Sequence, residues 1–218
     1  MNKNKIESYS LASDSWGAEE IEAINSVIKS NRYTMGPKVK MFEEEFAQYF
    51  GTNYGIMVNS GSSANLLMIA SLFLSNEYDL NKGDEVIVPA VSWSTTYYPV
   101  SQYGLKLVFV DIDRTTLNID IDEVIKAINP KTKVIFAVNL LGNPCDFERL
   151  QSLCNEKNII LIEDNCESLG AKYKKQYTGT FGIMGSFSFF FSHHMQTMEG
   201  GMIVTNSKKL YELCVSLR

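Results

Sequence analysis

The chain contains only two histidines, His193 and His194, which are adjacent in a polar segment between two apolar runs. An imidazole whose pKa lies near neutrality can accept and donate a proton at pH 7, which suits general acid–base catalysis. Histidine pairs on loops are more often simply solvated, so the residue type alone leaves both interpretations open. The pair is therefore a candidate for proton transfer that its surroundings must support.

Three carboxylates, Glu163, Asp164 and Glu167, follow the short apolar run 159–162 with no lysine or arginine beside them. If that run is a buried strand, the three side chains cluster at the carboxyl edge of a sheet, where α/β proteins bind ligands. A carboxylate there can pair with the protonated ring nitrogen of a cofactor. The alternatives are a helix-capping aspartate with solvated neighbours and a metal site. We expect no metal, because both histidines lie elsewhere in the sequence.

The segment 59–64 reads Asn-Ser-Gly-Ser-Ser-Ala and lies between a predicted strand and a predicted helix. Backbone N–H groups at such a helix start, together with small hydroxyl side chains, can hold an anion. A tight turn with a serine cap is an equally good interpretation. The segment is not a P-loop, since no Gly-Lys-Ser/Thr follows.

An aromatic segment that contains Trp93 follows another predicted strand end. Its indole could stack on a planar ring, although an aromatic side chain at such a place more often packs in a core or an interface.

The elements that must position these residues alternate between short apolar runs and helical patterns. The predicted strands are 54–58, 86–88, 107–110, 134–138, 159–162, 186–191 and 202–205. The predicted helices are 16–28, 39–50, a helix from about Ala64, 122–128, 147–155 and 208–218. Continuous apolar strands between helices require a parallel sheet covered on both faces. We therefore predict a doubly wound α/β fold with about seven strands in one mixed sheet.

The composition excludes several classes of protein. Of the 218 residues 45% are hydrophobic and 21% charged, which excludes a disordered or collagen-like chain. The net charge of −5 argues against a nucleic-acid partner. No apolar stretch approaches the roughly 20 residues that cross a bilayer, and no secretory signal is visible at the N-terminus. We expect a cytoplasmic protein without a membrane partner.

The end of the sequence has an unusual pattern. The segment 208–218 has apolar residues at helical spacing and no stop signal after them. We therefore expect this chain to be the front part of something longer. The predicted organisation is an N-terminal segment with the first helix, residues 1–35, and a larger cofactor-binding domain, residues 36–218, truncated at its C-terminal end.

Six motifs in a fixed order carry a resemblance to a known family. They are Tyr33-Thr-Met-Gly, Asn59-Ser-Gly-Ser-Ser-Ala-Asn, Pro89-Ala-Val-Ser-Trp-Ser-Thr-Thr-Tyr-Tyr-Pro, Asn139-Leu-Leu-Gly-Asn-Pro, Glu163-Asp-Asn-Cys-Glu-Ser and Ser192-His-His-Met-Gln-Thr-Met-Glu-Gly-Gly. From about Leu11 to Arg218 the chain resembles the sugar aminotransferases that use pyridoxal 5′-phosphate (PLP), the DegT/DnrJ/EryC1/StrS group of fold type I. The resemblance implies an aspartate-aminotransferase-like large domain with a mostly parallel mixed sheet. Members also have a small C-terminal domain, which we expect to be absent here.

The position of one lysine separates the branches of that family. In its aminotransferases, a lysine six residues before the residue that precedes the final Gly-Gly attaches the cofactor covalently. Counting back from Glu199 gives His193, and no lysine occurs between Lys175 and Lys208. An imidazole cannot form a Schiff base. The resemblance therefore points to the dehydratase branch and to His193 as the catalytic base and acid.

The resemblance also implies which residues hold the cofactor. Gly61, Ser62 and Ser188 would bind its phosphate, and Trp93 would stack on its ring. Asp164 would pair with the pyridinium nitrogen and keep the ring a good electron sink. Glu167 would lie close to the cofactor.

The implied reaction removes the C3 hydroxyl of a nucleotide-linked 4-keto-6-deoxyhexose, expected to be GDP-linked, in deoxysugar and O-antigen biosynthesis. PLP and pyridoxamine 5′-phosphate would be bound noncovalently, with L-glutamate as amino donor, and the full-length protein would be a homodimer. Two alternatives stay open. A truncated, noncatalytic cofactor-binding fragment fits the abrupt end, and an ordinary sugar aminotransferase is disfavoured by the missing lysine.

Overall fold

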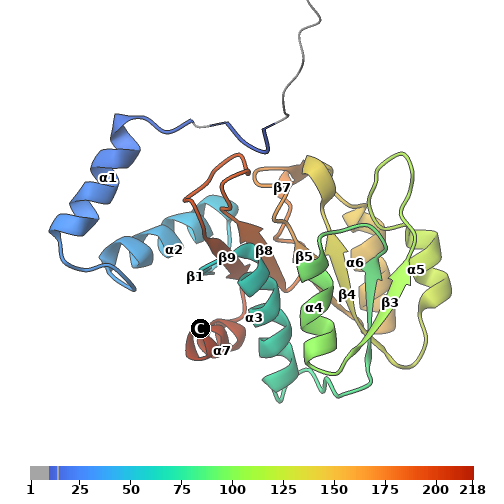
Figure 1. Cartoon of the computed structure of the whole chain (residues 1–218). Helices are drawn as coiled ribbons and strands as arrows, with labels where there is room; N and C mark the ends of the chain where they lie inside the picture. The colour runs from blue at the N-terminus through green and yellow to red at the C-terminus, as the bar shows by residue number, and fades with distance from the viewer. Residues whose placement is uncertain (1–9, 14) are drawn as a thin grey trace, which may run out of the picture.

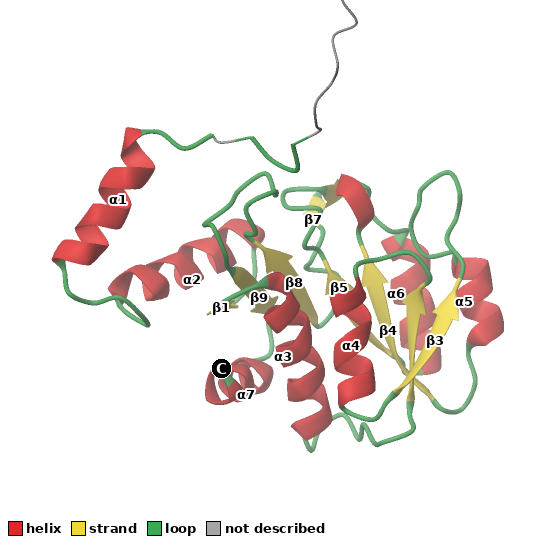
Figure 2. Cartoon of the chain, in the orientation of Figure 1, coloured by secondary structure: helices red, strands yellow, loops and turns green. Residues whose placement is uncertain are grey.

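A seven-stranded sheet forms the centre of the computed structural model, which describes residues 10–13 and 15–218 (Figure 1, Figure 2). Its strands, in spatial order, are β1 (Tyr54–Val58), β9 (Gly201–Thr205), β8 (Met184–Ser188), β5 (Ile160–Asp164), β4 (Thr132–Val138), β2 (Glu85–Pro89) and β3 (Lys106–Val110). Of the predicted N-terminal segment 1–35, residues 1–9 and Asp14 lie outside the described residues.

The pairing of the strands confirms the mostly parallel mixed sheet. The five strands β3, β2, β4, β5 and β8 are parallel to one another. Only β9 runs against both of its neighbours, β1 and β8. The carboxyl ends of β4, β5 and β8 and the first residue of β9 therefore meet at one edge.

Helices cover both faces of the sheet, as predicted. They are α1 (Ala18–Lys29), α2 (Pro37–Phe50), α3 (Gly61–Leu74), α4 (Ser94–Gln102), α5 (Ile121–Ala127), α6 (Phe147–Lys157) and α7 (Lys208–Leu217). Side chains of α3, α4 and α7 share one apolar core with the sheet. On the other face α5 and α6 build a second core, and α2 packs phenylalanines on β8 and β9. Among the described helices none has the length and apolarity that a bilayer-spanning segment needs.

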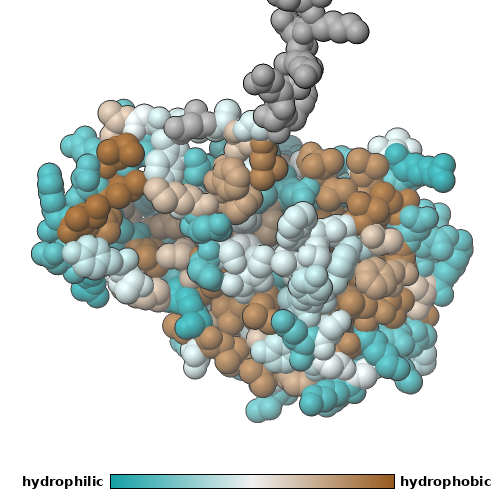
Figure 3. Space-filling view, in the orientation of Figure 1, coloured by the Kyte–Doolittle hydropathy of each residue, from teal (hydrophilic) through white to brown (hydrophobic). Residues whose placement is uncertain are grey.

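Helix α1 stands apart from these layers (Figure 1). It contains no buried residue, and Ile21 and Ile28 are 51% and 54% exposed. The space-filling view accordingly shows apolar surface over this helix (Figure 3). Gly17 is its N-cap, and the Glu20 side chain accepts a hydrogen bond from the Gly17 N–H at 2.6 Å.

Three elements were not predicted from the sequence, and one of them is the short 3-10 helix η1 (Leu140–Gly142). Helix α4 has nine residues and contains Pro99, so its own propensity for helix is low, and burial of Thr96 and Val100 stabilises it instead. A two-stranded hairpin, β6 (Lys172–Tyr173) with β7 (Gln176–Tyr177), is too short to give an alternating pattern. Strand β8 spans Met184–Ser188, whereas the predicted strand was 186–191. Residues 189–191 lie in the following loop.

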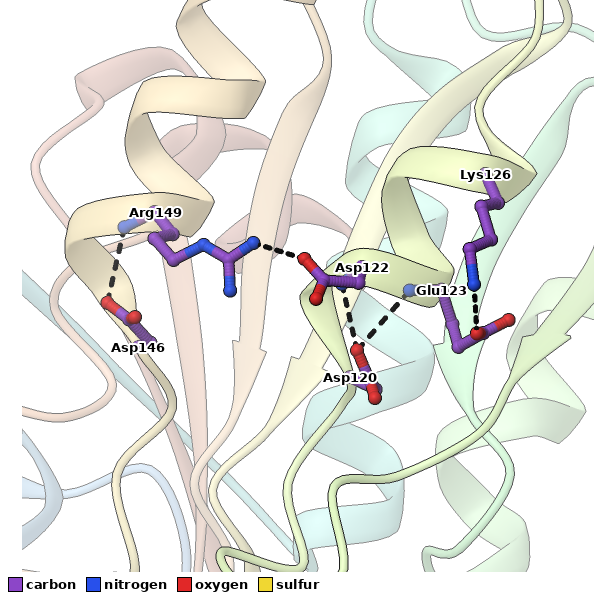
Figure 4. A network of polar contacts seen from close by, with 6 residues as sticks. All are labelled: Asp120, Asp122, Glu123, Lys126, Asp146 and Arg149. Carbon is purple, nitrogen blue, oxygen red and sulfur yellow. Dashed lines mark hydrogen bonds and ion pairs between the residues drawn. The ribbon is translucent and has the colours of Figure 1, made fainter.

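A chain of polar contacts joins the N-termini of α5 and α6 (Figure 4). Asp120 caps α5 by accepting from the backbone N–H of Asp122 at 2.8 Å, and Asp146 caps α6 by accepting from that of Arg149 at 3.3 Å. The Arg149 guanidinium also pairs with the Asp122 carboxylate across the two helices. These contacts fix the starts of both helices relative to each other.

Glu163 is a completely buried carboxylate that fastens a loop to the sheet. Its oxygens accept backbone hydrogen bonds from Gly179 at 2.6 Å, Phe181 at 2.5 Å and Gly182 at 2.8 Å. The Asn139 amide donates a fourth, at 3.1 Å. Burial raises the pKa of the Glu163 carboxyl, while the four donors act in the opposite direction. Each carboxylate oxygen accepts two hydrogen bonds, so both oxygens of Glu163 are fully used in holding the loop.

Replacing Glu163 with glutamine should therefore destabilise the fold. The glutamine side-chain nitrogen would replace one of the accepting oxygens and would face two N–H donors with its own N–H groups. Such a buried mismatch costs about 1–3 kcal/mol. Urea denaturation followed by circular dichroism measures the change in the free energy of unfolding. The matched control is Glu148→Gln, which breaks an exposed pair with Lys174 and should cost less than about 1 kcal/mol. Equal costs for the two variants would contradict this role of Glu163.

Candidate active site

A cavity of about 450 Å³ lies at the edge where the strands end and α3 begins. The seven residues predicted as site residues all line it: Gly61, Ser62, Trp93, Asp164, Glu167, Ser188 and His193. They come from five separate parts of the chain, so the fold brings together what the motifs only suggested. No lysine is among the lining residues within the described part of the chain.

One side of the cavity is the first turn of α3. Ser60 caps this helix, and its hydroxyl accepts from the Ser63 N–H at 3.1 Å. The first N–H groups of a helix have no partner within it, and here those of Gly61 and Ser62 are at the cavity. A Cβ on Gly61 would lie 2.6 Å from the Ser188 Cβ and 2.7 Å from the Cys166 Sγ. Only glycine therefore allows the turn to approach β8 and β5 this closely.

Another part of the cavity wall is the Asp164 carboxylate, which is 5% exposed at the end of β5. Its Oδ2 accepts from the Asn65 amide at 2.8 Å and from the Thr96 hydroxyl at 2.7 Å. Its Oδ1 accepts from the Cys166 backbone N–H at 3.1 Å. Among the described residues no lysine or arginine forms an ion pair with Asp164, so its negative charge is balanced only by hydrogen bonds.

Trp93 and Glu167 complete the walls. Trp93 directly precedes α4, and its side chain is 70% exposed, so a large flat surface faces outward at the cavity. The Glu167 carboxylate accepts from the Leu141 backbone N–H at 3.3 Å. An exposed indole beside a polar cavity offers a stacking surface for a planar ligand.

His193 lies on the loop between β8 and β9 and is half-buried. Burial lowers the pKa of its imidazole, and this effect outweighs the nearby Glu167 carboxylate, which acts to raise the pKa. The imidazole is therefore mainly neutral at pH 7, the form that accepts a proton. The adjacent His194 lines a neighbouring hollow and not this cavity. The two histidines are thus not equivalent.

The prediction that three carboxylates cluster at one site is wrong for Glu163. Asp164 and Glu167 line the cavity, whereas Glu163 binds the loop 179–182 and does not. Adjacent residues of a strand point to opposite faces, so Glu163 and Asp164 cannot share one site.

Two polar side chains in contact with Asp164 were missed by sequence reasoning. Asn65 is the only amide in the apolar helix α3, and a buried amide in such a helix is a signal that could have identified it. Thr96 gave no comparable signal, because α4 itself was not predicted.

The chemistry of these walls fits one type of ligand. A helix start with hydroxyl side chains suits a phosphate, and an unpaired carboxylate suits a cationic ring nitrogen. The exposed indole suits the face of the ring between them. The donor set therefore fits PLP. No group of three or more potential metal-ligating side chains occurs in residues 10–13 and 15–218.

Comparison with known proteins agrees with this site. A family model described as the DegT/DnrJ/EryC1/StrS aminotransferase family matches residues 14–218. The chain is 54% identical over 210 residues to GDP-4-keto-6-deoxy-D-mannose 3-dehydratase of Yersinia pseudotuberculosis. The aligned region covers 96% of this chain and 53% of that protein. The chain thus spans about half the length of the curated relatives it matches.

Solved structures share the fold. The E. coli GDP-4-keto-6-deoxy-D-mannose-3-dehydratase with bound hydrated PLP matches with a TM-score of 0.93 and 54% identity, over 97% of this chain and 54% of that one. A GDP-4-keto-6-deoxymannose-3-dehydratase with a trapped PLP-glutamate geminal diamine matches with a TM-score of 0.94 and 54% identity, over 97% and 55%. The predicted aminotransferase-like α/β fold is confirmed.

Adding a methyl group at Gly61 should distort the first turn of α3. The Gly61→Ala variant places a Cβ within 2.7 Å of two neighbours, and overpacking of this kind costs about 1–3 kcal/mol. Urea denaturation measures this loss. Ser62→Ala is the control, because it removes atoms from the same turn and should change stability by less than about 0.5 kcal/mol. A Gly61→Ala variant as stable as the control would contradict the close approach.

Proposed function

The chain belongs to the DegT/DnrJ/EryC1/StrS aminotransferase family, and on that premise we propose that it is a PLP-dependent 3-dehydratase or the cofactor-binding part of one. Its substrate would be a nucleotide-linked 4-keto-6-deoxyhexose that loses its C3 hydroxyl. The observation that carries the proposal is His193 in a cavity that no lysine of residues 10–13 and 15–218 lines. The 54% identity to enzymes with this name supports it.

The cofactor would be held by the walls already described. The N–H groups at the start of α3 and the hydroxyls of Ser62 and Ser188 would bind the phosphate. Asp164 would accept from the pyridinium nitrogen, and Trp93 would cover the ring. When bound, PLP or pyridoxamine 5′-phosphate supplies an electron sink for the carbons next to its amino group. Glu167 would contact the ring from the side of the Leu141 backbone.

His193 would move the proton that the dehydration requires. A neutral imidazole nitrogen accepts a proton at pH 7 and can then deliver it to the leaving C3 oxygen. The half-buried position keeps the imidazole neutral before the reaction, because burial lowers its pKa. A lysine at this position would be able to attach the cofactor covalently, whereas histidine leaves it free to be aminated and to stay bound.

The substrate and partners extend the proposal. A GDP-linked sugar is favoured by the names of the relatives at 54% identity, and L-glutamate as amino donor by the glutamate adduct in a solved relative. The product would enter deoxysugar and O-antigen biosynthesis. A homodimer, a cytoplasmic location and the division into residues 1–35 and 36–218 stay predictions.

The first test uses the purified chain with PLP. We expect an absorbance spectrum of bound cofactor and, after borohydride reduction, an unchanged intact mass, because no lysine in the described part of the chain lines the cavity. His193→Lys should create a site for covalent attachment and give the mass of one reduced adduct. His194→Lys is the matched control in the same loop, and it should give none, since residue 194 lies outside the cavity.

Two outcomes would count against the proposal. A specific adduct on a lysine of the parent chain would return the protein to the aminotransferases. Absence of PLP binding at saturating concentrations would exclude a complete cofactor site in this chain and favour the noncatalytic fragment.

The second test concerns the protonation of His193. We expect its imidazole proton signals in an NMR titration to report a pKa below the ordinary value of 6.5, because burial disfavours the charged ring. The chain has only two histidines, so His193→Asn and His194→Asn assign the signals directly. A pKa above 6.5 for the signal lost in His193→Asn would contradict a neutral base at pH 7.

A further inference from the structure

A continuous set of buried hydrogen bonds surrounds Asp164. Asn65 and Thr96 donate to its Oδ2, from α3 and α4 respectively. Each of these donors contacts a further hydroxyl: Asn65 that of Ser186 on β8, and Thr96 that of Ser92, which precedes α4 and itself lines the cavity. Asn65, Thr96 and Ser186 are essentially inaccessible to solvent. The set therefore joins two helices and two neighbouring strands around one carboxylate.

The direction of each proton in this set follows from Asp164. An ionised carboxylate only accepts, so the Asn65 amide must turn its Nδ2 toward Asp164 and its Oδ1 away. The Ser186 hydroxyl donates to that Oδ1 at 2.6 Å. If Asn65 flipped, its oxygen would face the Asp164 oxygen, so Ser186 holds the amide in the productive orientation.

The same logic applies on the side of α4. The Thr96 hydroxyl has a single proton, and Asp164 receives it at 2.7 Å. The Ser92 hydroxyl lies 2.9 Å from the Thr96 oxygen and must therefore be the donor between them. On the side of α3 and on the side of α4, each hydroxyl or amide therefore donates its hydrogen bond in the direction of Asp164.

These donors occupy most of the acceptor positions of Asp164. A carboxylate has about four lone-pair sites. Asn65 and Thr96 donate to Oδ2, and the Cys166 backbone N–H donates to Oδ1 at 3.1 Å. The Cys166 thiol also forms a hydrogen bond with the Asp164 carboxylate, and the carboxylate still lines the cavity, where a ligand can reach it.

We propose that Asn65, Thr96, Ser186 and Ser92 are positioning residues that hold the Asp164 carboxylate in one orientation, in which it accepts a hydrogen bond from a cationic ring nitrogen in the cavity. This inference rests on the proposed PLP site. Recognition of the ring nitrogen would then depend on four uncharged residues that hold Asp164 in place and need not touch the nitrogen themselves.

The test compares PLP with its 1-deaza analogue, in which a C–H replaces the ring nitrogen, by titration of the full 218-residue chain. The parent should bind PLP about tenfold or more tightly than the analogue, the worth of a hydrogen bond to a charged group. Thr96→Val keeps the shape and removes the donor, and Ser186→Ala frees the Asn65 amide to rotate. Each should reduce this preference to below about threefold. Thr96→Ser keeps the hydroxyl and should restore it.

Matched controls are buried hydroxyls outside the set. Thr178→Val and Ser71→Ala remove donors to backbone carbonyls, and both should keep the parent's preference. Asp164→Asn gives the baseline without a carboxylate.

The outcomes distinguish the pairing of Asp164 with the ring nitrogen from the role of the four positioning residues. A parent chain that binds both ligands equally would overturn the pairing of Asp164 with the ring nitrogen, and this inference with it. A parent preference that persists in Thr96→Val and Ser186→Ala would overturn the inference alone. Equal weakening of both ligands in these variants would show a merely structural role and would also overturn it.

Discussion

The alternation of side chains at the end of β5 is the constraint on which the site depends. Two adjacent carboxylates leave the strand on opposite faces: Glu163 fastens the loop 179–182, and Asp164 faces the cavity. The register with β4 and β8 fixes which residue takes which role, since Glu163 is paired with Gly185 and Asp164 with Ser186. A shift by one residue would exchange the two carboxylates and remove both functions.

The cavity wall combines groups of opposite electrostatic character, and no lysine or arginine of the described residues lines it. Partial positive charge comes from the first turn of α3, and negative charge comes from Asp164 and Glu167. A ligand with an anionic and a cationic group would therefore be recognised by backbone dipoles and a carboxylate. Burial lowers the pKa of the half-buried His193 imidazole, which favours its neutral form.

Much of this arrangement could be predicted from the sequence, and the remainder has a common cause. The apolar runs predicted the seven strands, because that signal is local, whereas the choice of His193 over its neighbour rested on the family resemblance. The contacts of Asp164 with Asn65 and Thr96 join residues 99 and 68 positions apart, so no local pattern encodes them. The role of Glu163 depends on strand pairing in the same way. Helix α4 was missed because tertiary packing, not propensity, stabilises it.

His193 belongs to the 189–200 connection, and in the described part of the chain no hydrogen bond joins its imidazole to the set around Asp164. The residue proposed to move the proton is thus not tied by hydrogen bonds to the residues proposed to recognise the cofactor. In evolutionary terms, the side chain at position 193 could be exchanged, and the outcome of the proposed reaction changed with it, while the hydrogen bonds around Asp164 are kept.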